Sequence, residues 1–499
     1  MNPEPKKKKT RGVKPWFYAV SLLVVAVLSI IGTLFVSSSS FGNMEETSAL
    51  ETEGVLSVSD TPQDNDFAVI QEAFARLKES YYQEVDDETL IEGAIAGMAE
   101  AVEDPYTEYL DDVESVTLEE DITGSFEGIG AEVMKEGEYV KVVSPIPGSP
   151  AEEAGLLPND LVMEVDGKAI EGMSLNEAVA LIRGEKGTDV VLTIDRGGQT
   201  FEVAITRDAI PVETVVYQLD ETHPEIGHIQ ITNFSLPTYD ELVEAVTSLR
   251  EQGAKAFVFD VRGNPGGLLN SAIELSNVFV EEGKPLFQIQ ERDNEPYVYH
   301  ANDELYGDFK VTEPSILLIN EGSASASEIL AAAMNESADI PLLGMPTFGK
   351  GTMQNVEPIG DGGELKITVG KWLTPSGKWV NEEGIVPTIE QELPSYVNLL
   401  LINRSKTYQE TDLSVEVENI ESILEALGYT PGTVDGYFDE QTTKAVSQFQ
   451  QEENLSVDGI VTGDTANLLV ERLRELIDQN DTQYDAAVEW LIDNHSMEQ

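Results

Sequence analysis

Four serines lie within residues 320–337, NEGSASASEILAAAMNES, where a turn leads into an alanine-rich stretch that favours a helix. Ser325 stands three residues before Glu328. S-x-x-E is the pattern of a capping box, in which a serine only closes the start of a helix. The same position suits a nucleophile, because N–H groups at a helix start can stabilise an oxyanion. This segment alone leaves both interpretations open.

A serine nucleophile also needs a base within hydrogen-bonding reach. None of the four histidines lies on a turn that could supply one (His223, His228, His300 and His495). A lysine can serve if desolvation keeps its amine neutral. Lys350 lies between Gly349 and Gly351, away from any helix face, and Gln354 follows as a neutral side chain that could orient the amine. The sequence therefore offers a Ser–Lys pair, supported by Gln354.

Three predicted strands end in turns that would position these residues. The first, residues 256–261, runs into a glycine-rich turn, and the second, residues 316–319, runs into the serine turn. A third, within IPLLGMPTFGKGTMQ, leads to Lys350. The carboxyl ends of parallel strands share one crevice in α/β sheets. We therefore expect an α/β domain over residues 209–392.

Composition excludes several classes of function. The chain has 499 residues, 92 acidic against 30 basic ones, and a formal net charge of −62, which disfavours nucleic acid as a partner. We favour a solvated acidic shell over an acidic binding face. There is no cysteine and no pair of histidines with metal-ligand spacing. We expect no metal and no cofactor.

A basic run precedes Trp16–Val36, an uncharged apolar segment. Its 21 residues suffice for a helix across a hydrocarbon layer of ~30 Å. The charge asymmetry predicts a cytoplasmic N-terminus and an ectodomain outside. We favour a retained single-pass anchor over a cleaved signal peptide, with residues 1–36 as basic tail and anchor and residues 37–66 as linker.

Residues 67–120 show apolar positions at helical spacing, beginning with Phe67, Ile70, Phe74 and Leu77. Such helices could pack within the chain or against a second subunit. The acidic segment 474–499 also favours an amphipathic helix that could join such a contact. We expect a homodimer.

Residues 121–208 are predicted as short strands punctuated by glycines, with an amphipathic helix at SLNEAVALIRG. GSPAEEAGLLPNDLVMEVDGKAI resembles the PDZ family. PDZ domains bind a peptide's C-terminus along a strand edge. The candidate peptide-binding residues are Gly128, Ile129, Gly130, Ala131, Leu181, Ile182 and Arg183, with Ala178 also expected in the apolar pocket. In some relatives a basic residue at the position of Arg183 couples peptide occupancy to catalysis.

EGSASASEILAAAM, TFGKGTMQ and DVRGNPGGLL together resemble the carboxyl-terminal processing proteases, tail-specific serine peptidases with a Ser–Lys dyad. The resemblance implies Ser325 as nucleophile, Lys350 as base and Gln354 as its support. Ala326 and either Gly266 or Gly267 would supply the oxyanion hole. Ser323 and Ser327 would keep the roles of turn and cap.

Two positions depart from that family's pattern. Gly263-Asn264 replaces a common Asn-Asn pair, and Thr388 replaces an aspartate near the end of the domain. The first departure weakens the expected support of the glycine turn. The second should have little effect on the chemistry.

Residues 413–473 resemble the peptidoglycan-binding domain through GYTPGTVDGYFDEQT, with Asp435, Asp439 and Asp458 expected to cap helices. An anchor and a wall-binding module would place the protein between membrane and wall, and we expect a Gram-positive bacterium as its source.

The sequence thus predicts a multidomain α/β and α+β protein. Its expected function is a membrane-anchored endopeptidase for proteins with apolar C-termini. A non-catalytic PDZ and wall-binding scaffold and a cell-wall hydrolase are the alternatives. The hydrolase lacks a recognisable lytic centre, whereas a scaffold would have no use for Ser325 and Lys350 together.

Overall fold

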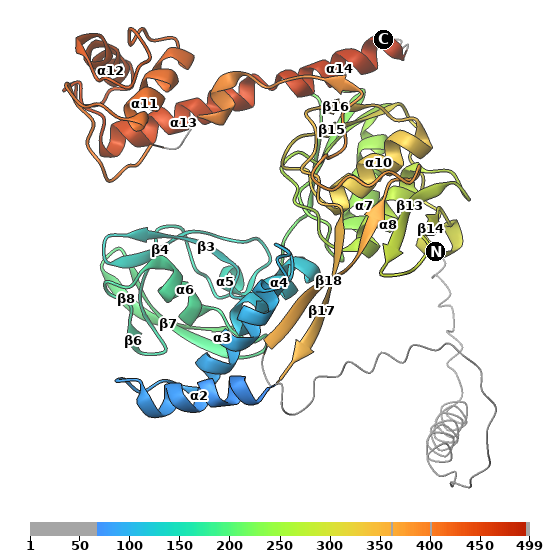
Figure 1. Ribbon diagram of the computed structural model, residues 1–499. Coiled ribbons are helices and arrows are strands. Elements are labelled where there is room, and N and C mark those ends of the chain that lie inside the picture. The colour runs from blue at the N-terminus through green and yellow to red at the C-terminus, as the bar shows by residue number, and fades with distance from the viewer. Residues whose placement is uncertain (1–66, 361–362, 400–401, 496–499) are drawn as a thin grey trace, which may run out of the picture. The chain divides into compact units, whose positions relative to one another are not determined.

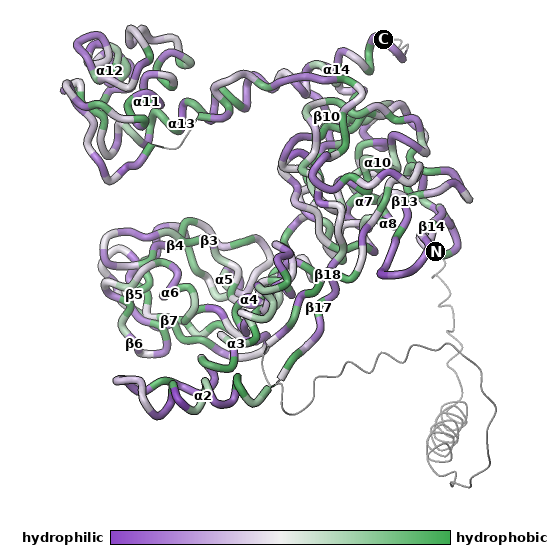
Figure 2. The backbone as a smooth tube through the Cα atoms, in the orientation of Figure 1, coloured by the Kyte–Doolittle hydropathy of each residue, from purple (hydrophilic) through white to green (hydrophobic). Residues whose placement is uncertain are grey.

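The computed structural model describes residues 67–360, 363–399 and 402–495, so the anchor and linker predicted before residue 67 lie outside them. No helix in these ranges is long and apolar enough to cross a membrane. Contacts divide the chain into two units, residues 1–84 and 85–499. In the first unit, α2 (Ala68–Ser80) alternates between hydrophobic and hydrophilic positions (Figure 2), and none of its residues is buried.

The second unit begins with two helices whose starts are capped by aspartates. Asp86 accepts hydrogen bonds from the first turn of α3 (Asp87–Glu100), and Asp111 forms a capping box with Glu114 in α4 (Asp112–Thr123). Between the helices, β1 (Glu108–Leu110) pairs with a strand of the α/β core described below. Pairing of β1 brings the segment that joins α3 and α4 to that core.

The next region contains an antiparallel sheet in the order β3-β4-β5-β7-β8, with β6 beside β5 and a separate β2–β9 pair (Figure 1). Its elements are β2 (Ser125–Gly128), β3 (Ala131–Glu136), β4 (Tyr139–Pro145), α5 (Pro150–Glu153), β5 (Leu161–Val165), β6 (Lys168–Ala169), α6 (Leu175–Ile182), β7 (Asp189–Arg196), β8 (Gln199–Thr206) and β9 (Asp208–Pro211). Buried residues Val140, Val162 and Leu192 form its core with Ala178 of α6.

The following domain is built on a six-stranded sheet in the order β10-β11-β12-β15-β16-β19, in which all pairs but β10–β11 are parallel. Its strands are β10 (Val215–Leu219), β11 (Ile226–Ile231), β12 (Ala256–Asp260), β15 (Ser315–Ile319), β16 (Leu342–Gly344) and β19 (Ile389–Glu390). Its helices are α7 (Thr238–Gln252), α8 (Leu269–Phe279), α9 (Asp303–Tyr306) and α10 (Ala326–Ala338).

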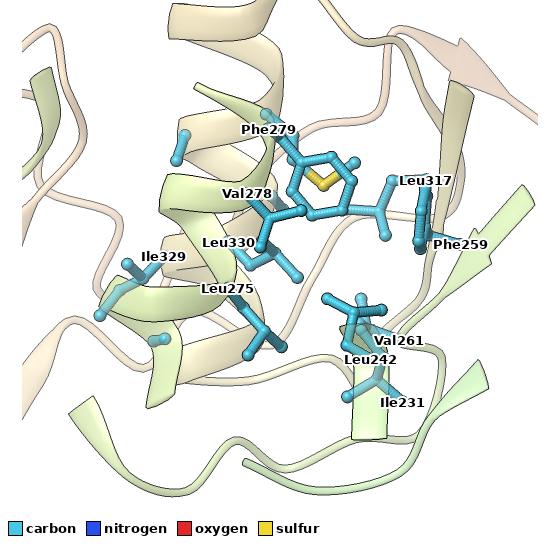
Figure 3. Close-up of a cluster of buried hydrophobic side chains, with 14 of the residues drawn as sticks. Ile231, Leu242, Phe259, Val261, Leu275, Val278, Phe279, Leu317, Ile329 and Leu330 are labelled. Carbon is cyan, nitrogen blue, oxygen red and sulfur yellow. The ribbon is translucent and has the colours of Figure 1, made fainter. Parts of the chain in front are cut away.

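Side chains alternate between the two faces of this sheet. Phe259 and Leu317 point toward Leu275 of α8 and Leu330 of α10 (Figure 3). Their neighbours in the strands, among them Val258, lie in a separate cluster on the other face. β12 and β15 are buried along their whole length, so their sequences are apolar runs rather than alternating patterns, except for Asp260 at the end of β12 and Ser315 at the start of β15.

A second sheet has the order β1-β18-β13-β14, with β17 paired to β18. Its strands from this domain are β13 (Pro285–Glu291), β14 (Tyr297–His300), β17 (Thr352–Ile359) and β18 (Gly363–Leu373). β17 begins two residues after Lys350. The hairpin β17–β18 therefore extends directly from the predicted base.

The C-terminal region holds η1 (Ser395–Asn398), α11 (Val415–Ala426), α12 (Glu440–Glu452), α13 (Gly463–Gln479) and α14 (Thr482–Asn494). Phe438, Phe449 and Leu469 are buried in the core that α11, α12 and α13 share.

Of the three predicted aspartate caps, one is confirmed. Asp439 accepts hydrogen bonds from the first turn of α12. The predictions for Asp435 and Asp458 are wrong: each accepts the N–H two residues ahead, from Tyr437 and Ile460 respectively. Both lie in Asp-Gly turns, where a short carboxylate closes the turn instead of a helix.

Candidate functional site

The turns after β12, β15 and β16 meet as predicted, and buried serine hydroxyls join the first two. Ser323 Oγ donates to the Val261 carbonyl at 2.8 Å, and Ser327 Oγ donates to the Asn264 carbonyl at 2.9 Å. The predicted roles of turn and cap were therefore incomplete for Ser323 and wrong for Ser327. Both hydroxyls bind the glycine-rich turn, because the two strand ends are neighbours in the sheet.

Ser325 lies immediately before α10 with φ of 54° and ψ of −111°, a conformation rare outside glycine. Such strain is typical of functional positions. The capping box that S-x-x-E predicts forms here: the Ser325 N–H donates to the Glu328 carboxylate at 2.8 Å, and the Glu328 N–H faces Ser325 and binds its carbonyl at 2.9 Å. Within the described residues the Ser325 hydroxyl donates no hydrogen bond. The half-buried hydroxyl is thus available for chemistry.

Glu328 is a site residue that the sequence analysis used only as a cap. It is fully buried, and its carboxylate accepts from the N–H groups of Ser325 and Lys350, both at 2.8 Å. It also accepts from Gly349 N at 2.7 Å and Thr347 Oγ1 at 2.6 Å. One carboxylate therefore holds the nucleophile's backbone against the base's backbone. The S-x-x-E spacing was the signal that could have found it.

Lys350 has the electrostatic environment expected of a base. Burial lowers the pKa of its ammonium below the ordinary value, and the positive charge of Lys366 lowers it further. Three carboxylates act in the opposite direction without reversing the shift (Glu108, Asp104 and Glu328). A larger fraction of Lys350 is therefore neutral near pH 7 than for a solvated lysine.

The amine and its predicted support are not joined in this conformation. Lys350 Nζ lies 4.6 Å from the ring centroid of Tyr106, in cation–π geometry. No hydrogen bond between Nζ and another described residue is found. Gln354 Nε2 donates to Thr352 Oγ1 and Thr368 Oγ1, at 3.1 and 3.0 Å. The expected contact from Gln354 to Lys350 is therefore absent here, because the two threonines bind the amide.

The backbone donors for an oxyanion can be told apart. Gly266 N–H donates to Asn264 Oδ1 at 2.9 Å, so it is already used. Among the residues that the structure describes, the N–H groups of Ala326 and Gly267 have no acceptor. A Cβ on Gly266 would lie 2.9 Å from Ser325 Cβ, so this turn abuts Ser325. The geometry favours Ala326 and Gly267 as the pair of donors.

These groups line a cavity of about 600 Å³. Ser325 and Lys350 lie on it together with Gly267, and Leu118 and Ile122 of α4 contribute another side of its wall. No group of three or more His, Asp or Glu side chains suited to a metal ion occurs within the described ranges. The arrangement can perform acyl transfer through the serine.

A second cavity, of about 260 Å³, lies between the Gly128–Ala131 segment and α6. In the described part of the chain, the N–H groups of Ile129 and Gly130 donate to no acceptor. Gly130 has φ of 73°, and a Cβ there would lie 2.4 Å from Ser149 Cβ. The predicted carboxylate-binding loop is therefore open and requires a glycine at position 130.

The helix side of this groove differs from the prediction at two residues. Leu175, Val179 and Ile182 line it, whereas Leu181 and Ala178 do not. Residues 175, 179 and 182 share the helical face that lines the groove, whereas Ala178 and Leu181 lie off that face and contact the domain's core, which Leu175 and Ile182 also touch. Only Ile182 of the three predicted helix residues was placed correctly.

Arg183 also lines the groove, and it is not simply solvated. Its Nη1 contacts both carboxylate oxygens of Glu120 in α4, at 2.9 and 3.0 Å, and its guanidinium lies over Phe126. Because α4 also lines the cavity beside Ser325, Arg183 links the two cavities.

Comparisons with known proteins find family models that match separate parts of the chain. Four family models match: peptidase family S41 at residues 225–391, a PDZ domain at 141–196, a peptidoglycan binding domain at 414–469, and the N-terminal domain of the activating protease CtpB at 24–114. The carboxy-terminal processing protease CtpA of Bacillus subtilis is 44% identical over 429 residues, which are 86% of this chain and 91% of that protein.

CtpB of the same organism is 35% identical over 481 residues, 94% of this chain and 99% of that protein. Among solved structures, a photosystem II D1 C-terminal processing protease matches with 29% identity and a TM-score of 0.39, over 66% of this chain and 89% of that one.

Proposed function

The chain belongs to peptidase family S41, the carboxy-terminal processing proteases, and from this premise we propose that Ser325 is its nucleophile and Lys350 its general base. The resemblances that the motifs indicated, to this family and to PDZ and peptidoglycan-binding domains, are confirmed. The proposal extends them to individual residues and to the reaction.

In the proposed reaction, neutral Lys350 Nζ accepts the proton of Ser325 Oγ while this oxygen attacks the scissile carbonyl carbon. The N–H groups of Ala326 and Gly267 stabilise the resulting oxyanion. The C–N bond then breaks, and Lys350 returns its proton to the leaving amine. Water, deprotonated by Lys350, hydrolyses the acyl-enzyme ester, and the proton goes back to Ser325.

One observation carries this proposal. A serine whose hydroxyl donates to no described residue, a lysine whose pKa burial lowers, and two N–H groups without an acceptor in the described ranges share one cavity. A helix cap or a structural lysine would need none of these neighbours. Lys350 Nζ lies over the Tyr106 ring and makes no hydrogen bond with Ser325, and on this basis we propose that the conformation described is a resting one.

Substrate selection is proposed to begin at the PDZ groove. The N–H groups of Ile129 and Gly130 would bind a terminal carboxylate, and Val179 and Ile182 would contact an apolar last side chain. A bound peptide would lie beside Arg183, whose ion pair with Glu120 leads to α4. Peptide binding is therefore proposed to shift the resting site toward its active arrangement.

The location of the protein is proposed from its N-terminal apolar segment and its peptidoglycan-binding module. Residues 16–36 are proposed to anchor it in the membrane, with the peptidase outside the cytoplasm and the C-terminal module on peptidoglycan. Exposed apolar residues of α2 and α3 support a homodimer through this region. Protease accessibility on intact cells and sedimentation of the purified protein test these two points.

The dyad is tested with the purified protein, Ser325→Ala and Lys350→Ala, incubated with an unfolded protein that ends in apolar residues. Parent activity should require a PDZ-binding peptide or such a C-terminus, and both variants should lose it. Lys378→Ala, at an exposed lysine, is the matched control and should cleave normally. Cleavage by the Ser325→Ala variant at the parent's rate would exclude the proposal.

A further inference from the structure

The C-terminal helix α14 is part of the peptidase core, although the peptidoglycan-binding module precedes it in the chain. Its residues Ala487 and Leu491 are fully buried and pack on Val258 and Leu318. These side chains belong to the sheet face opposite α8 and α10. In Figure 1, α14 lies beside β15 and β16, in agreement with its contacts. Without α14 this apolar face would be bare.

The peptidoglycan-binding module is therefore an insertion between β19 and α14. Its two connections to the core are fastened to each other. Gln483 Nε2 donates to the Gln391 carbonyl at 2.8 Å, and Thr482 Oγ1 donates to the Glu392 carbonyl at 3.0 Å. The point at which the inserted module leaves and rejoins the core is thus a single, hydrogen-bonded place.

At this junction, Asp481, the residue before α14, and Gln483 in its first turn bind an arginine of the active-site turn. Arg262 Nη1 and Nη2 donate to the two oxygens of Asp481 at 2.8 and 2.6 Å, and Nη1 also donates to Gln483 Oε1 at 3.0 Å. On its other side, Arg262 binds the buried Asp260 at 2.6 Å. The arginine is largely buried, with 13% of its side chain exposed.

Arg262 begins the turn that ends at Gly267. Several contacts hold the middle of this turn, among them those of Asn264: its Nδ2 donates to the Ile231 carbonyl at 2.8 Å, and its carbonyl accepts from Ser327 Oγ and from Ala324 N. At the turn's first residues, Asp481 acts beside two other anchors: Asp260 on the Arg262 side chain, and Asn320 Oδ1, which accepts from Gly263 N at 2.9 Å. Asp481 also caps α14 by accepting from Tyr484 N at 3.0 Å, so it is fixed itself.

We propose that Asp481 is a positioning residue for peptidase chemistry, acting through Arg262 on the turn that presents the Gly267 N–H. The inference rests on the proposed oxyanion role of Gly267. It makes the junction of the peptidoglycan-binding insertion a part of the catalytic apparatus. Gln483 contributes the second contact from the same junction.

The test compares the full chain with Asp481→Asn and Asp439→Asn. Asparagine caps helices as well as aspartate does, so both variants keep their caps. Only the first loses a carboxylate that binds Arg262, whereas Asp439 caps α12 within the inserted module. Reactive serines are counted by labelling to completion with a fluorophosphonate. The value of kcat per labelled serine, together with KM, is then measured on one peptide substrate.

For Asp481→Asn, kcat per labelled serine should fall about tenfold, the factor of one lost hydrogen bond between charged groups, with KM within about twofold of the parent. Asp439→Asn should match the parent. In an Arg262→Lys background, the further effect of Asp481→Asn should shrink, because the two residues act as a pair.

A kcat within twofold of the parent for Asp481→Asn, or an equal loss in Asp439→Asn, would overturn the proposal. A loss that appears only as fewer labelled serines would also overturn it, since that is the result of a purely structural role. Failure of the proposed function is distinguishable, because it would appear as cleavage by Ser325→Ala whatever the Asp481 variants do.

Discussion

Replacement of Glu328 by glutamine should separate the nucleophile from the base. The carboxylate accepts four hydrogen bonds, two on each oxygen: Ser325 N and Lys350 N on Oε2, and Thr347 Oγ1 and Gly349 N on Oε1. An amide has one oxygen and one NH2 group. Whichever way it is turned, at least one backbone N–H faces the NH2 group, and two do so if the NH2 group takes the Oε2 side.

The loss follows from this count. Hydrogen bonds to charged groups contribute about 1.5–3 kcal/mol each, so one to two lost bonds cost about 1.5–6 kcal/mol. Because Glu328 is fully buried, water cannot replace them. If the two turns separate locally, kcat should fall between about tenfold and 10⁴-fold. If the whole domain opens, the free energy of unfolding should fall by the same amount.

The assay is kcat per fluorophosphonate-labelled serine, with thermal unfolding measured on the same samples. Glu336→Gln is the matched control, because Glu336 lies on the same helix, is exposed and accepts one N–H, from Ser376. Glu336→Gln should be close to the parent in both measurements. If Glu328→Gln kept both parent kcat and parent stability, the idea that one carboxylate holds the two turns together would be refuted.

Three further predictions concern the base and the groove. Lys366→Gln removes a positive charge that lowers the Lys350 pKa, so the Lys350 pKa should rise. In a plot of kcat/KM against pH, the rising limb should therefore move to higher pH, with lower activity at neutral pH. An unmoved pH profile would contradict this prediction. Tyr106→Leu removes the ring that holds Lys350 in the resting conformation, so cleavage measured without a PDZ ligand should rise. The expected rise is about 2- to 30-fold, which corresponds to a cation–π contact of ~0.5–2 kcal/mol. Tyr106→Phe keeps the ring and should leave cleavage unchanged. Gly130→Ala should weaken binding of an apolar C-terminal peptide about tenfold or more, because position 130 has positive φ and no room for a Cβ. Calorimetry measures this affinity. An unchanged affinity would exclude the groove as the peptide site.

The motifs predicted much of the site because they are local. Ser325 and Lys350 each follow a short buried strand, and the carboxyl ends of parallel strands necessarily meet at one edge of the sheet. The PDZ loop at Gly130 was visible for the same reason, since glycines directly before a strand allow the positive φ that such a loop needs. These predictions required only the chain order and the strand pattern.

Predictions that depended on which way a side chain points were less successful. Ala178 and Leu181 lie on the wrong side of α6 for the groove, because the phase of a short helix depends on what it packs against. Gln354 was expected to bind Lys350, but two threonines of the β17–β18 hairpin bind its amide. Sequence spacing does not determine such a choice among neighbours.

The sequence by itself determined the order of domains, the serine–lysine pair and the glycines around it, because each is written in a contiguous motif whose physical requirement is local. Only the tertiary structure decided which glycine keeps a free N–H, and that Glu328 binds both turns. It also joined Arg262 to Asp481, 219 residues later in the chain. The physical reason is that the strands before the active-site turns carry apolar side chains on both faces of the sheet, so a helix must cover the second face as well. The chain supplies that cover with its last helix, after the inserted module has been completed.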